Sequence, residues 1–287
     1  MSASTLRPPL VILAAGRARR YGGVKPLAPV GTHGEAVIDL VASDALAAGF
    51  GSIVLVLGPE TGPAIRYHVE RTWPSGVSVE FATQRRPLGT VNAVLSAAEF
   101  ISSTPYGVGN ADDIYGRAAF AQMAEHLSGA QASDALVGYR LSNAIVGSAP
   151  VTRGVCQLDD QGRLLSVAER RQVSSVGDGT FRSADGLEPE ELSPDALVSM
   201  NLWGFTPAFH QVLVEAMAAA TDASEEAEVL LPVVVADALP THPFTVLPTD
   251  GRCIGVTHPD DLALVQAELN HQVGRGERAA ALWSVGV

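Results

Sequence analysis

The chain has 287 residues, 47% of them hydrophobic, which is enough for a continuous apolar core in one large α/β domain or two small ones. Asp and Glu number 31 against 19 Lys and Arg, and the resulting net charge of -12 repels polyanions and argues against a nucleic-acid partner. A small anionic substrate would have to be attracted by a few cations and a metal gathered in a pocket. The two cysteines, Cys156 and Cys253, lie far apart without metal-ligand spacing, which argues against both a zinc site and a disulfide framework.

The sequence carries no signal for export or membrane insertion. A strand-like apolar run begins within about ten residues of the N-terminus, without the basic segment and long apolar stretch of a signal peptide. No apolar run approaches the roughly 20 residues that a membrane-spanning helix needs. We therefore expect a cytoplasmic protein with no membrane partner. The oligomeric state is left open, and a homo-oligomer is compatible with the sequence.

In the first half of the chain, short apolar runs alternate with helical patterns. The patterns predict strands at 10–13, 53–57, 77–81 and 106–108, and helices at 36–48 and 90–101. Strands separated by helices of this length indicate right-handed crossovers. The predicted fold class is therefore α/β, with a mostly parallel sheet covered by helices on both faces. In such sheets the ligand binds beyond the carboxyl ends of the strands.

The second half has a different pattern. Residues 155–158 and 164–167 flank an Asp/Gly-rich turn and predict a β-hairpin. The Gly-, Ser-, Asp- and Glu-rich segment 174–194 is interpreted as a mobile flap or a second hairpin. A strand at 197–205 and helices at 207–220 and 259–272 follow. With no repeat and no linker, one domain over 1–287 is expected, with a hairpin or lid region at 150–205 and C-terminal strands and helices at 206–287.

The stretch from residue 10 to residue 27 is the most informative. A buried strand ends in the small residues Ala14, Ala15 and Gly16, so backbone amides can approach a ligand closely, and the loop that follows carries Arg20 and Lys25. Arginine offers a planar fork of donors for a leaving pyrophosphate, and lysine a compact charge for an α-phosphoryl group. A basic surface turn after an edge strand would give the same pattern, because a short Gly-rich loop is a weak signal on its own.

Two further segments follow later strands. Residues 84–90 read Gln-Arg-Arg-Pro-Leu-Gly-Thr, and the amide of Gln84 can pair with the edge of a pyrimidine. Asp112 and Asp113 follow the strand at 106–108, where a hard carboxylate oxygen suits Mg²⁺ that also holds phosphates. Side chains alternate along an extended chain, so Asp113 can point away from Asp112. The alternatives are a turn before a helix and an Asp-rich helix cap.

Residues 10–40, with Gly34, Glu35, Ile38 and Asp39 after the loop, resemble the N-terminal signature of the sugar-phosphate nucleotidyltransferases. The segments at 84–90 and 109–116 resemble further motifs of this family. The resemblance implies a three-layer, Rossmann-like GT-A fold, an NTP-binding half at 1–120 and a Mg²⁺ cofactor. It implies catalytic roles for Arg20 and Lys25, metal binding by Asp112, and nucleotide binding by Leu13, Ala14, Ala15, Gly16, Gln84, Pro87, Gly89, Thr90 and Asp112. Ala18 stands where the family has a second glycine.

The resemblance extends to the acceptor side. Segment 166–170 resembles the family's acceptor segment, which implies that Glu169 binds sugar hydroxyls and that Arg170, in place of the usual lysine, binds the acceptor phosphate. Asn201 and Asp113 are the other predicted acceptor contacts. Gly255 stands where many members have a second metal-binding aspartate, and Asp113, Asp250 or Glu169 could compensate for it.

The expected function is transfer of a nucleoside monophosphate from an NTP, with a pyrimidine favoured through Gln84, to a sugar 1-phosphate. The residues at 256–262 also resemble the related cytidylyltransferases, which leaves a polyol or amino-alcohol phosphate open as the acceptor. A GT-A glycosyltransferase is a further alternative, but it releases no pyrophosphate and does not need the pair Arg20 and Lys25. A non-catalytic nucleotide-binding homologue also stays open because of Gly255.

Overall fold

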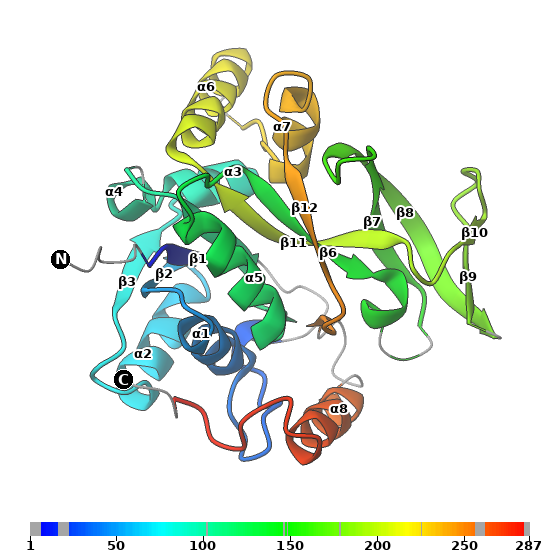
Figure 1. Cartoon of the computed structure of the whole chain (residues 1–287). Helices are drawn as coiled ribbons and strands as arrows, with labels where there is room; N and C mark the ends of the chain where they lie inside the picture. Colours follow the sequence, from blue (N-terminus) through cyan, green and yellow to red (C-terminus); the bar gives the residue numbers. More distant parts are fainter. Residues whose placement is uncertain are drawn as a thin grey trace.

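The computed structural model describes residues 7–16, 23–101, 103–145, 147, 149–177, 179–224, 226–255 and 262–283. In these residues eleven strands form one large sheet (Figure 1), with the order β10-β9-β8-β7-β11-β4-β1-β2-β3 and with β6 between β11 and β12. A second, two-stranded sheet pairs β5 (Asp113–Ile114) with β13 (Ile254–Gly255). The first strand of this small sheet, β5, comes directly after β4 in the chain and carries Asp113 of the candidate site.

The first half of the sheet is parallel, as predicted. Strands β3, β2, β1 and β4 are neighbours in that order and run in the same direction. Their bounds are β1 (Pro9–Ala14), β2 (Ser52–Leu57), β3 (Val79–Thr83) and β4 (Tyr106–Asn110). The connections hold α1 (Val37–Ala47), α2 (Gly62–Thr72), α3 (Gly89–Leu95) and α4 (Ala98–Ile101). The helix expected at 90–101 is divided in two, because the amide of Ala97 bonds the carbonyl of Val94 only three residues back.

The second half is antiparallel. Strand β11 (Leu197–Phe205) pairs antiparallel with β4, β6 (Ala135–Arg140) and β7 (Val151–Leu158). The predicted hairpin is β7 with β8 (Leu164–Gly177), longer than expected. Strands β9 (Thr180–Ser183) and β10 (Glu191–Leu192) extend it, so segment 174–194 is a second hairpin rather than a flap. The last strand of the large sheet, β12 (Thr245–Thr249), lies parallel to β6.

Side chains that alternate along the central strands build one apolar core on each face of the sheet. On β1, Leu10 and Ile12 belong to one core and Val11 to the other. The first core packs against α1, α2, α5 (Arg117–Ser128) and α8 (Leu262–Gly274). The second packs against α3, α6 (Pro207–Ala223) and α7 (Leu231–Ala238). The result is the predicted three-layer arrangement, with helices on both faces of the sheet (Figure 1).

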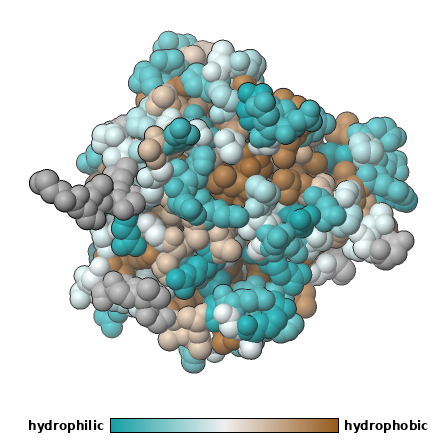
Figure 2. All heavy atoms as spheres, viewed as in Figure 1, coloured by the Kyte–Doolittle hydropathy of each residue, from teal (hydrophilic) through white to brown (hydrophobic). Residues whose placement is uncertain are grey.

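The C-terminal segment packs on the N-terminal layer. Arg278 forms a largely buried ion pair with Asp44 of α1 at 2.6 Å, and the ring of Trp283 lies 5.2 Å from that of Trp73. Both cysteines are buried and free. Among the described residues, no helix combines the length and apolar character needed to cross a membrane. Polar residues cover much of the face shown in Figure 2, with an apolar area near its middle.

Candidate active site

Lys25 and Asp112 meet at the carboxyl edge of the parallel strands. Because β1 and β4 are adjacent and parallel, their ends lie side by side, and the amide of Ala111 bonds the carbonyl of Leu13 at 3.1 Å. Lys25 begins the short 3₁₀ helix η1 (Lys25–Leu27), and its Nζ donates to Oδ2 of Asp112 at 2.6 Å. The other predicted catalytic cation, Arg20, lies outside the described residues. Lys25 is also the only lysine in the sequence.

The predicted loop residues stand at the same edge. Leu13 and Ala14 end β1, and Ala15 and Gly16 follow, with Gly16 exposed. A Cβ on Gly16 would have nothing within 4 Å, so the backbone there borders open space. Small residues beyond a buried strand leave room for a ligand against the main chain.

The predicted base-binding segment, residues 84–90, is tied together by internal hydrogen bonds. The Nε2 group of Gln84 donates to the carbonyl of Gly89 at 3.0 Å and to Oδ1 of Asn92 at 3.1 Å. Since a carbonyl only accepts, the nitrogen must face Gly89, and the amide oxygen of Gln84 is left as an acceptor. Pro87 in the same segment is exposed.

Gly89 and Thr90 also hold the segment that leads into α7. Gly89 has φ +89°, and a Cβ on it would collide with the carbonyl of Val229 and lie 2.6 Å from the Val229 nitrogen. The hydroxyl of Thr90 accepts from the amide of Leu231 at 2.8 Å. The side chain of Thr90, predicted to bind nucleotide, is therefore already bonded within the protein.

Three of the four predicted acceptor residues line one cavity of about 260 Å³, namely Asp113, Glu169 and Asn201. Asn201 has φ +60° and lies in an irregularity of β11 between Ser199 and Trp203, a conformation that asparagine tolerates better than most residues. The hydroxyl of Tyr115 accepts from the amide of Asn110 at 2.8 Å and donates to the carbonyl of Met200 at 3.1 Å. Tyr115 thus connects the end of β4 to the irregular part of β11.

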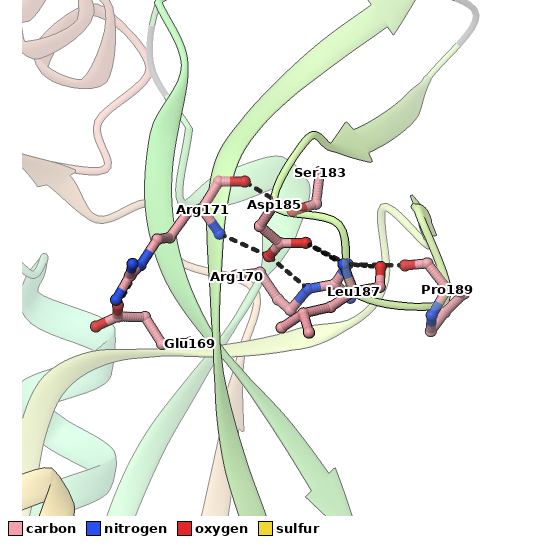
Figure 3. A network of polar contacts seen from close by, with 7 residues as sticks. All are labelled: Glu169, Arg170, Arg171, Ser183, Asp185, Leu187 and Pro189. Atoms are coloured by element: carbon pink, nitrogen blue, oxygen red, sulfur yellow. Dashed lines mark hydrogen bonds and ion pairs between the residues drawn. The ribbon is translucent and has the colours of Figure 1, made fainter.

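Arg170, the fourth predicted acceptor residue, is not among the described residues that line this cavity. Its side chain is 4% exposed and turns toward the loop before β10 (Figure 3). It donates to both carboxylate oxygens of Asp185, at 2.9 and 3.2 Å, and to the carbonyls of Leu187 and Pro189. These bonds hold the pKa of Asp185 well below its usual range. The structure therefore does not place Arg170 where it was predicted, because the buried pair takes up its guanidinium.

Arg153 was not predicted, yet it lines the cavity. Its Nε and Nη2 donate to the carbonyl of Ala144 at 2.9 and 2.6 Å, and its Nη1 donates to the carbonyl of Thr152 at 2.8 Å. Burial lowers the pKa of Arg153, and the charge of Asp113 acts in the opposite direction. In the sequence, Arg153 stands two residues before the predicted hairpin strand, and this position does not indicate where its side chain points.

Asp113 occupies the space that a side chain at position 255 would need. The two residues are paired in the small sheet, and a Cβ on Gly255 would lie 2.8 Å from Oδ1 of Asp113. The other carboxylate oxygen accepts from Nδ2 of Asn110 at 2.9 Å. Burial, and then the charge of Asp112, raise the pKa of Asp113 to about 6, against lowering contributions from Asn110, Lys25 and Arg153. A side chain at position 255 is therefore incompatible with the observed position of the Asp113 carboxylate.

These two carboxylates fit a magnesium ion better than a metal held by protein alone. The described residues contain no group of three or more His, Cys, Asp or Glu side chains that could hold a metal ion. Mg²⁺ characteristically uses one or two carboxylates, waters and substrate phosphates. Asp112 and Asp113, neighbouring carboxylates that follow a strand end, match that requirement, and the pKa of Asp113 is raised by burial and then by the charge of Asp112.

A larger cavity, of about 750 Å³, lies elsewhere in the molecule. The C-terminal part of α1, the start of α5 and the segments 250–252 and 272–283 line it. Of the residues singled out from the sequence it includes Asp250, whose exposed carboxylate pairs with Arg140. The candidate site is therefore assigned from the contact of Lys25 with Asp112 and the neighbouring Asp113, and not from cavity size.

A three-layer α/β fold with small residues directly after β1, one lysine and two carboxylates at the carboxyl edge is that of the GT-A type of nucleotide-binding proteins. Residues 10–242 match the family described as nucleotidyl transferase, and the chain belongs to this family. It is 27% identical over 168 residues to a glucose-1-phosphate thymidylyltransferase of Mycolicibacterium smegmatis (strain ATCC 700084 / mc(2)155). That match covers 56% of this chain and 54% of the relative, so the chain spans about half the length of the curated relative it matches.

Solved structures agree on the fold. HddC from Yersinia pseudotuberculosis, in a complex with GMP-PN, is 17% identical, with a TM-score of 0.62 over 91% of this chain and 99% of that one. A UDP-glucose pyrophosphorylase in complex with UDP-glucose is 15% identical, with a TM-score of 0.65 over 93% and 100%. At these identities the likeness shows the fold alone. The family and the fold class predicted from the sequence are confirmed.

Proposed function

We propose that this chain transfers a nucleoside monophosphate from an NTP to a sugar 1-phosphate, giving an NDP-sugar and pyrophosphate. The observation that carries the proposal is the contact of Lys25 with Asp112 at the strand ends. The next residue in the sequence, Asp113, lines the cavity together with Glu169 and Asn201. This arrangement offers charge for a triphosphate and polar groups for a hydroxylated acceptor at one edge of the sheet.

The reaction needs alignment and charge neutralisation from the protein. An acceptor phosphate is already ionised near neutral pH, so its oxygen can attack the α-phosphorus in line without a general base or a protein nucleophile. Lys25 stabilises the charge that develops at the α-phosphoryl group, and Arg20 holds the departing pyrophosphate. Asp112, with Asp113 beside it, would hold Mg²⁺, which neutralises phosphate charge when bound.

The base is proposed to be uracil or thymine. The amide oxygen of Gln84 is an acceptor, because both Nε2 hydrogens are used within residues 84–92. An acceptor at this point matches the N3–H donor of uracil and thymine, whereas N3 of cytosine is itself an acceptor. The thymidylyltransferase named among the relatives agrees with this choice, which places the cytidylyltransferase alternative second.

A screen of pyrophosphate release, with the common NTPs crossed with several sugar 1-phosphates, tests the activity. A true substrate pair should also raise the melting temperature, because ligands stabilise the state that binds them. Absence of pyrophosphate release with every pair, together with nucleotide-dependent stabilisation, would support the non-catalytic alternative. Consumption of an NDP-sugar without pyrophosphate chemistry would support the glycosyltransferase alternative.

Because Lys25 is the only lysine, amine chemistry can report on it alone apart from the N-terminus. Reductive methylation with ¹³C-formaldehyde should give one side-chain NMR signal that shifts when NTP binds. Lys25→Met is expected to lower turnover several hundredfold, about 3–4 kcal/mol of transition-state stabilisation. The matched control is Arg182→Met, which removes an exposed cation from β9. An unchanged signal with saturating NTP, or full turnover in Lys25→Met, would remove Lys25 from the reaction.

A further inference from the structure

Two arginines face each other across the β7–β8 hairpin but have opposite environments. The strand register pairs Arg153 of β7 with Arg170 of β8. Arg170 is buried in an ion pair with Asp185 and bonds two further carbonyls (Figure 3). Arg153 lines the acceptor cavity instead. The hairpin therefore uses one arginine to fix a loop and leaves the other at the cavity wall.

Arg153 has capacity for a further anionic partner. Within the described parts of the chain it takes part in no ion pair, while the arginines on either side of it in sequence, Arg140 and Arg163, each pair with a carboxylate. Its bonds go to the neutral carbonyls of Ala144 and Thr152 and use three of its five N–H groups. One N–H remains on each terminal nitrogen, which is the fork that suits two oxygens of a phosphate. A partly buried cation is costly, and since Arg153 feels the charge of Asp113 without forming an ion pair with it, a bound anion would offset more of this cost.

The other polar residues at the cavity favour hydroxyl groups rather than an anion. Asp113 and Glu169 are carboxylates, and Ser199 and Asn201 are neutral. The carboxylates accept hydrogen bonds from hydroxyls and repel a phosphate. Arg153 is the one cation among the described residues that line the cavity. An acceptor that carries both hydroxyls and a phosphate would therefore direct its phosphate to the Arg153 side.

We propose that Arg153, rather than its cross-strand neighbour Arg170, binds the phosphate of the acceptor. The inference rests on the proposed function and assigns the acceptor to phosphate monoesters of small polyhydroxylated molecules. Arg170 instead anchors residues 185–189 beside the hairpin. Arg153, paired with Arg170 on the adjacent strand, thus takes the role that the resemblance implied for Arg170.

The test compares Arg153→Met, Arg153→Lys and Arg170→Met in pyrophosphate-release kinetics, with glucose 1-phosphate as acceptor and TTP or UTP as donor. Arg153→Met should raise the KM for glucose 1-phosphate about 10- to 100-fold and leave the KM for the NTP within about twofold. Arg153→Lys should recover part of the loss, and millimolar methylguanidinium should partly restore Arg153→Met. The control is Arg182→Met, which removes an exposed cation from β9 that pairs with Glu191 and does not line the cavity. A purely structural role would give no guanidinium rescue and equal effects on both substrates.

A binding measurement separates this inference from the proposed function. Calorimetric titration with glucose 1-phosphate, inorganic phosphate and glucose does not require turnover. Wild-type protein should bind the first two and lose them in Arg153→Met, whether or not any NTP supports the reaction. If Arg170→Met loses phosphate binding while folded Arg153→Met keeps it, the assignment is overturned. If the phosphate ligands bind normally but no NTP gives pyrophosphate, the proposed function fails and the assignment of Arg153 stands.

Discussion

Replacing Asp113 by asparagine is expected to stabilise the metal-free protein at neutral and higher pH. Burial and the charge of Asp112 raise the pKa of Asp113 from 3.8 to about 6. Because the folded-state pKa lies above the unfolded-state value, the carboxyl group contributes stability below pH 3.8, and this contribution is lost as the pH rises through 6. A shift of about 2 pKa units, at 1.36 kcal/mol per unit, corresponds to about 3 kcal/mol. Asparagine keeps the shape, can still accept from Asn110, and carries no charge.

The assay is urea unfolding of wild type and Asp113→Asn in EDTA between pH 5 and pH 8. The variant should be more stable by about 3 kcal/mol at pH 8, and about half of this difference should be lost by pH 5, where the wild-type group is largely protonated. Asp112→Asn in the same series should flatten the pH dependence, since the charge of Asp112 is the second cause of the shift. A difference between wild type and Asp113→Asn that does not change with pH would refute the reasoning. Loss of turnover in the more stable variant would show that the charge is kept for function.

Two further substitutions test other parts of the structure. Gly255→Ala is expected to displace the carboxylate of Asp113 and so to lower turnover. It should also lower the stability by about 1–3 kcal/mol, as overpacking usually does. The control is Gly274→Ala, where the added Cβ meets open space, and equal behaviour of the two variants would contradict the prediction. His210→Gln is expected to weaken the pH dependence of unfolding below about pH 6.5, because burial lowers the pKa of His210, so that its stabilising contribution is present at higher pH and lost as the pH falls. Unfolding curves of wild type and variant at pH 8 and pH 5 check this, and a constant difference between them would count against it. Asp113 lowers the stability as the pH rises, whereas His210 lowers it as the pH falls. The effect of each residue is therefore obtained by comparing wild type with the variant of that residue.

The central part of the fold was accessible from the sequence because local patterns determine it. Apolar runs such as 53–57 are too short for helices and are flanked by turn residues, which is enough to predict buried strands. Once β1 and β4 are taken as parallel strands, the residues after each must share an edge, so the meeting of Lys25 with Asp112 follows from topology. The hairpin of β7 and β8 was likewise signalled by its turn.

The directions of single side chains were not accessible. Whether an arginine on β8 faces the cavity depends on the alternation of side chains between the two faces of the sheet. Irregularities in the β7–β8 pairing, one of them between Val151 and Arg153, change this alternation locally. The partner that draws Arg170 away is Asp185, on a loop with no sequence signal of its own. The role of Thr90 depends on Leu231, which is 141 residues away in the sequence. Such contacts are set by tertiary packing, which a local pattern does not record.

The charge balance at the site bears on how so acidic a protein would bind the anionic substrates proposed for it. Two carboxylates, Asp112 and Asp113, are accompanied by two cations, Lys25 and Arg153, and these four side chains together carry no net charge when all are ionised, while Glu169 adds a further negative charge at the cavity. An NTP and a phosphate ester bring several negative charges, more than these residues offset. In the proposed reaction the remainder would come from Mg²⁺ bound to the carboxylates and from Arg20. Burial and repulsion of the carboxylates lower the stability of the metal-free protein. The same carboxylates are the proposed ligands of Mg²⁺, so stability and catalysis are expected to oppose each other at Asp113.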